Sequence, residues 1–399
     1  MLDIWPAFPI VVMCHDTPHS QLRGVRNVIA ALKCPDRVCE INLQGVQENL
    51  LKRVAAINVP FPTLTSLRLS SGFGDYECLG QPIITDSILG GIAPRLRSLD
   101  LHGIAFPEPQ KLLLSATDLV TLRLERIPSI GYISPEEIVT CLSTLTKLEE
   151  LALGFRTFRL PPFHPHQTSQ SLLPSPSTVL PTLTSFRFRG DSWYLEDFIP
   201  RIAFPLLGNL DVTFIGWRNV DSPPLCEFIN RIETLDMHHR ADISFHDDFV
   251  NITLSRQEGL ADCGKIKFGI LCSTLDLQLF CLMQLRSFSL PSLLTLEHLY
   301  IHGHGSFPLD CRQLSPENAR WLEILHPFTS VKKLYLSEKP ALRVARALQG
   351  LSGEKVASML PALQNISFIG HEPSGATLDA IGNFVATLQL SGRSVSVHC

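Results

Sequence analysis

The stretch Leu119-Val120-Thr121-Leu122-Arg123-Leu124 decides how this chain is expected to fold. Leucines stand at its first, fourth and sixth positions, and polar residues stand at its third and fifth positions. Because successive side chains of a strand point to opposite faces, the leucines can be buried on one side while the polar residues face solvent. The stretch therefore predicts a short strand with one packed face and one solvated face.

The same spacing, with other apolar residues allowed, recurs along nearly the whole chain. Neighbouring copies start 23 to 35 residues apart, except for one step of 64 residues. Clear copies span residues 64–69, 96–101, 119–124, 148–153, 183–188, 207–212, 232–237, 296–301, 331–336 and 363–368, and a weaker copy spans 38–43. Such a repeat predicts strands stacked into one parallel sheet over a continuous core, with the chain returning between strands through helices.

The starts of the return helices are also visible in the sequence. Ser134 suits an N-cap, Pro135 suits the first helical position, and Glu137 completes a capping box. The ninth position of a regular leucine-rich repeat is Asn or Cys, whereas here it holds residues such as Gly72 and Ile104. The fold class expected is α/β, an irregular leucine-rich-repeat solenoid with a curved parallel sheet and helices on its convex side.

We predict three parts along the chain. Residues 1–37 form an N-terminal cap, residues 38–370 form the irregular solenoid, and residues 371–399 form a C-terminal cap that includes a helix near 380–390. Within the solenoid, residues 161–181 contain six prolines and are expected to form an exposed loop. Residues 238–290 hold degenerate repeats, with extra or distorted strands followed by a helix over 274–285.

Composition narrows the class of protein. The chain has 399 residues, 45% of them hydrophobic, and a net charge of −4, which supplies a large core and argues against a nucleic-acid partner. The 11 cysteines are an odd number spread along the chain, as expected for thiols in a reducing compartment. The N-terminus is a poor signal peptide, and no apolar run is long enough to span a membrane. We expect a cytoplasmic or nuclear location and no membrane partner.

No catalytic or cofactor-binding motif is found. The sequence lacks a Walker loop, a G-x-G-x-x-G turn and a G-x-S-x-G elbow, so we predict no enzyme activity and no cofactor. His298, His302 and His304 lie close together, but a metal site needs three or four converging ligands with supporting contacts. These histidines are interpreted as part of a polar contact surface.

Several segments resemble a known family, the F-box and leucine-rich-repeat-like proteins expanded in mushroom-forming (basidiomycete) fungi. The segments that carry the resemblance are residues 90–99 (GGIAPRLRSL), 112–119 (LLLSATDL), 131–136 (GYISPE), 321–328 (WLEILHPF) and 360–366 (LPALQNI). In that family an N-terminal helical F-box docks the adaptor subunit of a cullin–RING ubiquitin ligase. This chain begins with residues similar to those that follow the module, so its F-box is expected to be absent or encoded upstream.

The resemblance implies a non-catalytic protein-interaction module, the substrate-recognition repeat domain of an F-box-type ubiquitin-ligase receptor. The alternative is a free-standing leucine-rich-repeat scaffold with no ligase link. An F-box upstream in the reading frame would separate the two. Without one, this chain should fail to co-purify with the ligase adaptor, and the protein partner itself is unknown.

The partner site is expected on the concave face of the sheet, at the third, fifth and seventh positions of the repeats. Arg and Tyr are the side chains that interfaces favour as anchors, so Arg123, Arg187, Arg189, Tyr300 and Tyr335 are the first candidates. The full set of candidate partner-binding residues is Arg68, Asp100, Arg123, Glu125, Arg187, Arg189, Asp236, His298, Tyr300, Lys333 and Tyr335. The same row contains His102, Glu150, Asp211, His238 and His302.

Overall fold

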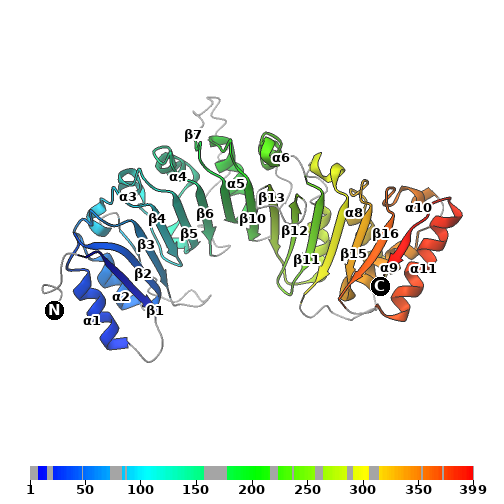
Figure 1. Cartoon of the computed structure of the whole chain (residues 1–399), viewed down its shortest axis with the longest axis horizontal. Coiled ribbons are helices and arrows are strands. Elements are labelled where there is room, and N and C mark those ends of the chain that lie inside the picture. Colours follow the sequence, from blue (N-terminus) through cyan, green and yellow to red (C-terminus); the bar gives the residue numbers. More distant parts are fainter. Residues whose placement is uncertain are drawn as a thin grey trace. The chain divides into compact units, whose positions relative to one another are not determined.

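The structure, a computed structural model, forms two compact units, residues 1–207 and 208–399 (Figure 1). Each unit combines a sheet with helices. The residues that the structure describes are 8–15, 21–46, 48–71, 83–85, 88–156, 178–215, 223–235, 238–256, 264–284, 291–304, 314–351, 354–370 and 373–398.

The sheet of the first unit is parallel, and its strands follow the order of the chain. Each strand pairs with the next one, with a register shift in three of the six pairs. In order across the sheet, the strands are β1 (Ile10–His15), β2 (Val38–Val46), β3 (Ser66–Ser71), β4 (Ser98–His102), β5 (Thr121–Ile127), β6 (Glu150–Phe155) and β8 (Ser185–Gly190). The repeated spacing of leucines therefore builds adjacent parallel strands, as the sequence predicts.

Short helices connect these strands and cover one face of the sheet. They are α1 (Gln21–Ala31), α2 (Glu48–Ala55), α3 (Gln110–Ser115), α4 (Pro135–Leu142) and α5 (Ser192–Phe198), with 3-10 turns η2 (Ile88–Gly91), η3 (Ser129–Gly131) and η4 (Ile199–Arg201). Helix α4 begins as predicted, because the Ser134 side chain accepts from the Glu137 backbone N–H while the Glu137 carboxylate accepts from the Ser134 N–H.

The leucines of the repeat form the core between sheet and helices. Leu119 and Leu122 are fully buried and Leu124 is 2% exposed. The hydrogen-bonded strand starts only at the third position of the repeat, here Thr121, because the first leucine lies in the turn that precedes the strand. That turn is closed by a bond from the Leu119 N–H to the Ala116 carbonyl, 3.1 Å long.

The second unit contains parallel strands and one antiparallel strand. Across its sheet the strands are β10 (Asn209–Ile215), β13 (Lys265–Leu271), β12 (Phe249–Ser255), β11 (Arg240–Phe245), β14 (His298–Gly303), β15 (Lys333–Ser337), β16 (Asn365–Ile369) and β17 (Ser396–His398). Strand β12 is antiparallel to both of its neighbours, and the other pairs are parallel. The sheet is thus mostly parallel, and the expectation of degenerate strands in 238–290 matches β11, β12 and β13.

The strand predicted at 232–237 is wrong. Residues Glu233–Leu235 form a 3-10 turn, η5, and the strand of this repeat is β11, which begins at Arg240. Ile232 and Leu235 are still buried, because a spacing of three residues also fits one face of a 3-10 turn. Met237, the third apolar residue of that copy, lies outside the described residues.

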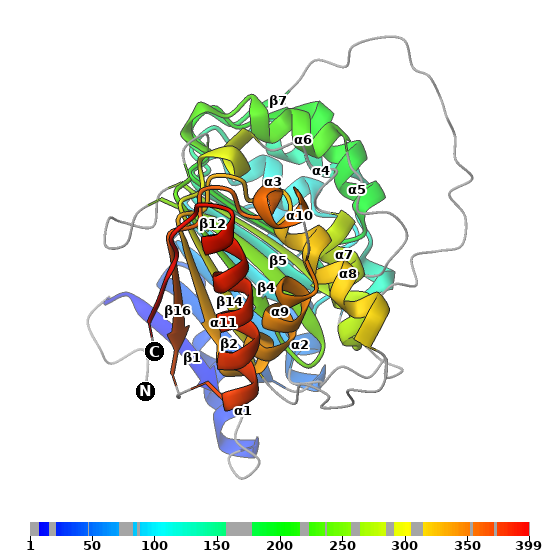
Figure 2. The ribbon, with the colours of Figure 1, turned by 90° about the vertical axis from the view of Figure 1, so that its right-hand side faces the viewer.

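Helices cover one face of the second sheet as well. They are α6 (Pro223–Asn230), α7 (Leu275–Gln284), α8 (Leu314–Leu325), α9 (Glu338–Gln349), α10 (Glu354–Ser358) and α11 (Gly375–Leu390), with a 3-10 turn η7 (Pro291–Thr295). Helix α9 packs against β14, β15 and β16, and α11 packs against α9 (Figure 2). The helices expected near 274–285 and 380–390 are therefore present as α7 and α11.

The predicted loop at 161–181 lies mostly outside the described residues. Its last part is described: β7 (Thr178–Val179) pairs in parallel with β9 (Ile202–Ala203), and Leu180 is buried. The predicted boundaries at residues 37 and 370, and a solenoid that runs through both units, stay predictions.

Candidate functional site: the open face of the sheets

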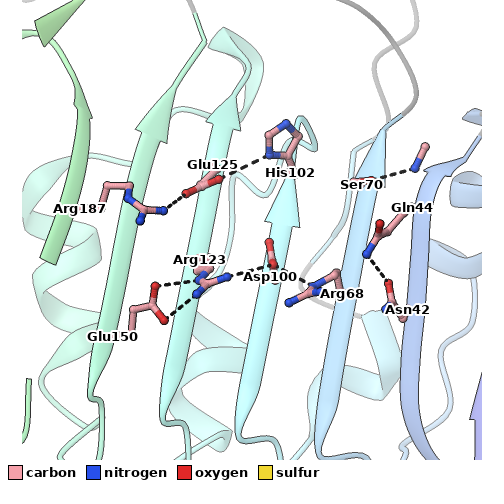
Figure 3. Close-up of polar contacts among 11 residues, drawn as sticks. Asn42, Gln44, Arg68, Ser70, Asp100, His102, Arg123, Glu125, Glu150 and Arg187 are labelled. Carbon is pink, nitrogen blue, oxygen red and sulfur yellow. Dashed lines mark hydrogen bonds and ion pairs between the residues drawn. The ribbon is translucent and has the colours of Figure 1, made fainter. Parts of the chain in front are cut away.

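Each sheet has one face that its helices do not cover, which we call the open face. The side chains on it alternate along every strand with the buried residues of the core. In the first unit one row of register partners crosses the sheet, namely Asn42, Arg68, Asp100, Arg123, Ala152 and Arg187. Figure 3 views part of this face, with the helices behind the strands.

Charges of opposite sign alternate over three residues of this row, Arg68, Asp100 and Arg123, and form a chain of ion pairs that continues to Glu150. Arg68 Nε lies 3.0 Å from Asp100 Oδ2, and an Nη of Arg123 lies 4.0 Å from the same carboxylate (Figure 3). Arg123 also binds Glu150 with two parallel hydrogen bonds of 2.9 and 2.8 Å. A planar guanidinium held at two points on a carboxylate has little freedom left, so Arg123 is held in one orientation.

A second cluster lies one step further along the strands. Arg187 Nη donates to Glu125 Oε1 at 3.2 Å, and His102 Nδ1 lies 3.6 Å from Glu125 Oε2 (Figure 3). The contact with His102, followed by that with Arg187, lowers the pKa of Glu125. The carboxylate is therefore fixed in its charged form between two donors.

Burial and pairing shift the pKa values of the central groups in different directions. Burial raises the pKa of Asp100, and the charges of Arg68 and Arg123 counter part of that rise. The hydrogen bonds to Glu150 raise the pKa of Arg123. Five candidate residues thus lie together on this face and pair mainly with one another. They are Arg68, Asp100, Arg123, Glu125 and Arg187.

Arg189 is the exception in this unit. It is exposed and stands beside Gly154 in register, at the carboxyl end of β8. Burial lowers the pKa of Arg126, and the nearby positive charges of Arg156 and Arg189 lower it further. Arg189 therefore lies at a basic end of the face rather than in the chain of ion pairs.

The open face of the second unit is built from rings instead. The rings of Tyr300 and Tyr335 are stacked, 4.1 Å apart and 4° from parallel, because these residues are register partners on β14 and β15. The guanidinium carbon of Arg240 lies 3.8 Å from the centre of the Tyr300 ring. Arg240, Tyr300 and Tyr335 thus form a stack across three neighbouring strands.

Asp242 fixes the cationic end of this stack. Its carboxylate accepts two hydrogen bonds from Arg240, at 2.8 and 2.9 Å, and lies 3.5 Å from His302 Nε2. Burial raises the pKa of Asp242, but the contacts with His302 and Arg240 outweigh burial and hold that pKa below its ordinary value.

Imidazole rings extend the aromatic character of this face. The His298 ring lies 6.1 Å from that of Tyr335, and the two planes are 12° apart. At the other end of β14, His304 stacks on His246 at 4.7 Å, and His246 stacks on Phe249 at 4.0 Å. Burial, with the neighbouring His304, lowers the pKa of His246. Candidates His298, Tyr300 and Tyr335 therefore belong to one set of rings, next to the exposed Lys333.

One predicted member of the row does not lie on the open face. His238 is fully buried and lies before β11, which corrects its expected place on the open face. Asp236 lies outside the described residues. Asp211 is half-buried on β10, 3.9 Å from Lys267 Nζ on β13.

Sequence reasoning missed Arg240 and Asp242. They stand beside His298 and Tyr300 in register, at the third and fifth positions of the repeat, because the strand starts later than predicted. The signal was available in the alternation of Ala241, Ile243 and Phe245, all of which are buried. That alternation places Arg240 and Asp242 on the opposite face.

Within the described ranges, no group of three or more His, Cys, Asp or Glu side chains converges so as to hold a metal ion. No helix in the same ranges combines the length and apolar character needed to cross a bilayer.

No family model matches the chain, and no curated protein matches it. Among solved structures, the chain is similar to the leucine-rich repeat-containing protein LegL7 from Legionella pneumophila, with 16% identity over 86% of this chain and 97% of that one. The TM-score of 0.32 is too low for this likeness to support an argument about function.

Proposed function

We propose that this chain is a non-catalytic protein-interaction domain, an irregular leucine-rich-repeat solenoid whose open face receives a protein partner. The observation that carries the proposal is the stacked set Arg240, Tyr300 and Tyr335 on a face that no described helix covers. Tyrosine and arginine are enriched among the few residues that carry most of the binding energy at protein interfaces, since rigid amphipathic groups lose little entropy on contact.

The partner class follows from the family resemblance. We propose that the domain recognises substrates as part of an F-box-type ubiquitin-ligase receptor. The alternative is a scaffold with no ligase link. The resemblance in residues 90–99, 131–136 and 321–328 favours the ligase role over the scaffold.

The first test measures partner capture from an extract of the organism that encodes the chain. Tyr300→Ala and Tyr335→Ala should each reduce the recovered partners at least about tenfold, as expected for truncated anchors. Arg231→Ala is the matched control, because Arg231 is an exposed arginine on the helix side, paired with Glu227. Unchanged recovery with both tyrosine variants, which must first show the circular dichroism of the parent, would contradict the proposal.

The second test separates the ligase role from the scaffold role. The chain is mixed with the purified ligase adaptor, and a complex is sought by size-exclusion chromatography. A stoichiometric complex would place the docking surface within these residues. Its absence, together with a reading frame that contains no F-box upstream, would favour the scaffold.

A further inference from the structure

A row of rings on the open face of the second unit is interrupted at one position. In register across the strands lie Tyr300, Tyr335, Ser367 and His398. Tyr300 fills one face of Tyr335. On the other side the next strand carries only the short side chain of Ser367, and the exposed His398 stands one strand further.

The width of this gap suits one planar group. Neighbouring strands are about 4.8 Å apart, so Tyr335 and His398 are separated by about 9.6 Å at the backbone. Aromatic rings stack with centroids about 4.5 to 7 Å apart. One ring inserted over Ser367 would therefore stack on Tyr335 and His398 at the same time.

The surroundings of the gap favour a negatively charged neighbour for that ring. The open-face positions of β14 to β17 hold His298, Tyr300, His302, Lys333, Tyr335, Ser337, Asn365, Ser367, Ile369, Ser396 and His398, with no carboxylate among them. Lys333 is exposed beside the gap, whereas its neighbour Lys332 is already held by Glu297 at 2.8 Å. The charge of Lys333 is thus available to a partner.

We propose that the gap over Ser367 is a recognition slot for an aromatic side chain of a protein partner, flanked in that partner by acidic residues that pair with Lys333. The inference rests on the proposed function, since it names the kind of segment that the interaction face takes. Stacking supplies selectivity for a planar ring, and Lys333 supplies selectivity for negative charge.

The test uses three amidated seven-residue peptides, dye-labelled through a glycine spacer, and fluorescence anisotropy. The first has one tryptophan between pairs of glutamates, the second has leucine in place of tryptophan, and the third has lysines in place of the glutamates. The first peptide should bind saturably. The other two should bind at least about tenfold more weakly, which corresponds to the loss of one stacking or charge contact.

Variants of the protein locate the site. Ser367→Trp fills the slot with the protein's own ring and should weaken binding of the first peptide at least tenfold, while Ser367→Ala should change it less than about threefold. Lys333→Ala should weaken binding of the first peptide, and Lys332→Ala should not. Because an inserted indole shifts the resonances of a stacked ring, the peptide should also move the His398 signals in proton NMR of the parent protein.

The outcomes distinguish the slot from the broader proposal. Equal binding by the tryptophan and leucine peptides, equal binding by the parent and Ser367→Trp, or no saturable binding would overturn the slot. Tighter binding of a single-stranded oligonucleotide at the same residues would also overturn it, since the occupant would then be a base. The proposed function fails separately, when Tyr300→Ala and Tyr335→Ala leave partner capture unchanged.

Discussion

The open faces of the two units are built from different kinds of side-chain contact. In the first unit, Arg68, Asp100, Arg123 and Glu150 neutralise one another across neighbouring strands. In the second unit, Tyr300 and Tyr335 stack, and only one end of the stack is closed by a charge, that of Arg240. A partner of the first face must compete with existing ion pairs, whereas a partner of the second can add to a stack.

This difference changes how the candidate anchors are ranked. Arg123 already uses one edge of its guanidinium, Nε and one Nη, on Glu150, and its other Nη lies 4.0 Å from Asp100. Moving it to a partner would break two charge-assisted hydrogen bonds, so little net binding energy is gained. Tyr335 stacks on Tyr300 through one ring face, so covering its other face breaks no ion pair. The tyrosines are therefore the stronger candidate anchors, although nothing in the sequence separates them from the arginines.

The largest expected effect is on stability, and it tests whether the two sheets pack equivalent cores behind their open faces. Leu122 on β5 and Leu299 on β14 are both fully buried at equivalent positions of the repeat. Leu122→Ala and Leu299→Ala should each reduce the free energy of unfolding by about 2–5 kcal/mol. Urea denaturation measures this. Leu114→Ala, at a 44% exposed leucine on α3, is the control and should stay within about 0.5 kcal/mol. A small effect at either buried leucine would mean that the register assigned to that unit is wrong.

The next prediction tests whether the charged side chains on the open face of the first unit are paired with one another. A double-mutant cycle with Arg123→Ala and Glu150→Ala should give a coupling of about 1 kcal/mol, because the pair is bidentate and mostly shielded from water. The coupling should fall in about 1 M salt. The cycle for Lys147 and Asp118, a pair exposed to solvent, should show no measurable coupling. Equal coupling energies for the two pairs would contradict the claim that the charges on the first open face are held in ion pairs.

A smaller effect concerns stability at low pH, and its direction differs between Asp242 in the second unit and Asp100 in the first. The pKa of Asp242 is held below its ordinary value of 3.8, so its contribution to stability is present above that value and is lost as the pH falls through the folded-state pKa. Burial raises the pKa of Asp100 above 3.8, so the folded state instead gains relative stability as Asp100 takes up a proton.

Urea denaturation of the parent, Asp242→Asn and Asp100→Asn between neutral pH and about pH 3 checks these signs. The advantage of the parent over Asp242→Asn should shrink on acidification. The parent should gain relative to Asp100→Asn over the same range. Two curves that change in the same direction would show that one of the two carboxylates is not in the environment described.

The smallest effect is expected at Arg189, the exposed member of the first unit's row. Arg189→Ala removes a positive charge near Arg126 and breaks no ion pair among the described residues, so it should raise the free energy of unfolding by a few tenths of a kcal/mol at most. Arg187→Ala, which leaves Glu125 with one donor fewer, should lower it by a comparable amount. A loss at Arg189 as large as that at Arg187 would mean that Arg189 has a structural partner.

The sequence by itself determined where most strands lie and which residues are buried beneath them. Leucine spacing and the capping residues of α4 act over a few residues, so they can be read locally. The spacing failed at 232–237, where Ile232 and Leu235 fit a 3-10 turn as well as a strand. Local periodicity could not choose between them, since pairing of β11 with β12 and β14 made that choice.

Only the tertiary structure decided what the open-face residues do. The sequence placed Arg123 and Tyr335 on one face, but their neighbours come from strands 27 and 35 residues away, at Glu150 and Tyr300. Which side chains meet depends on strand order and register, and these are fixed by packing of the whole repeat. For the same reason the slot over Ser367 has no local signature: a serine marks a recognition site here only because a tyrosine and a histidine lie on the strands beside it.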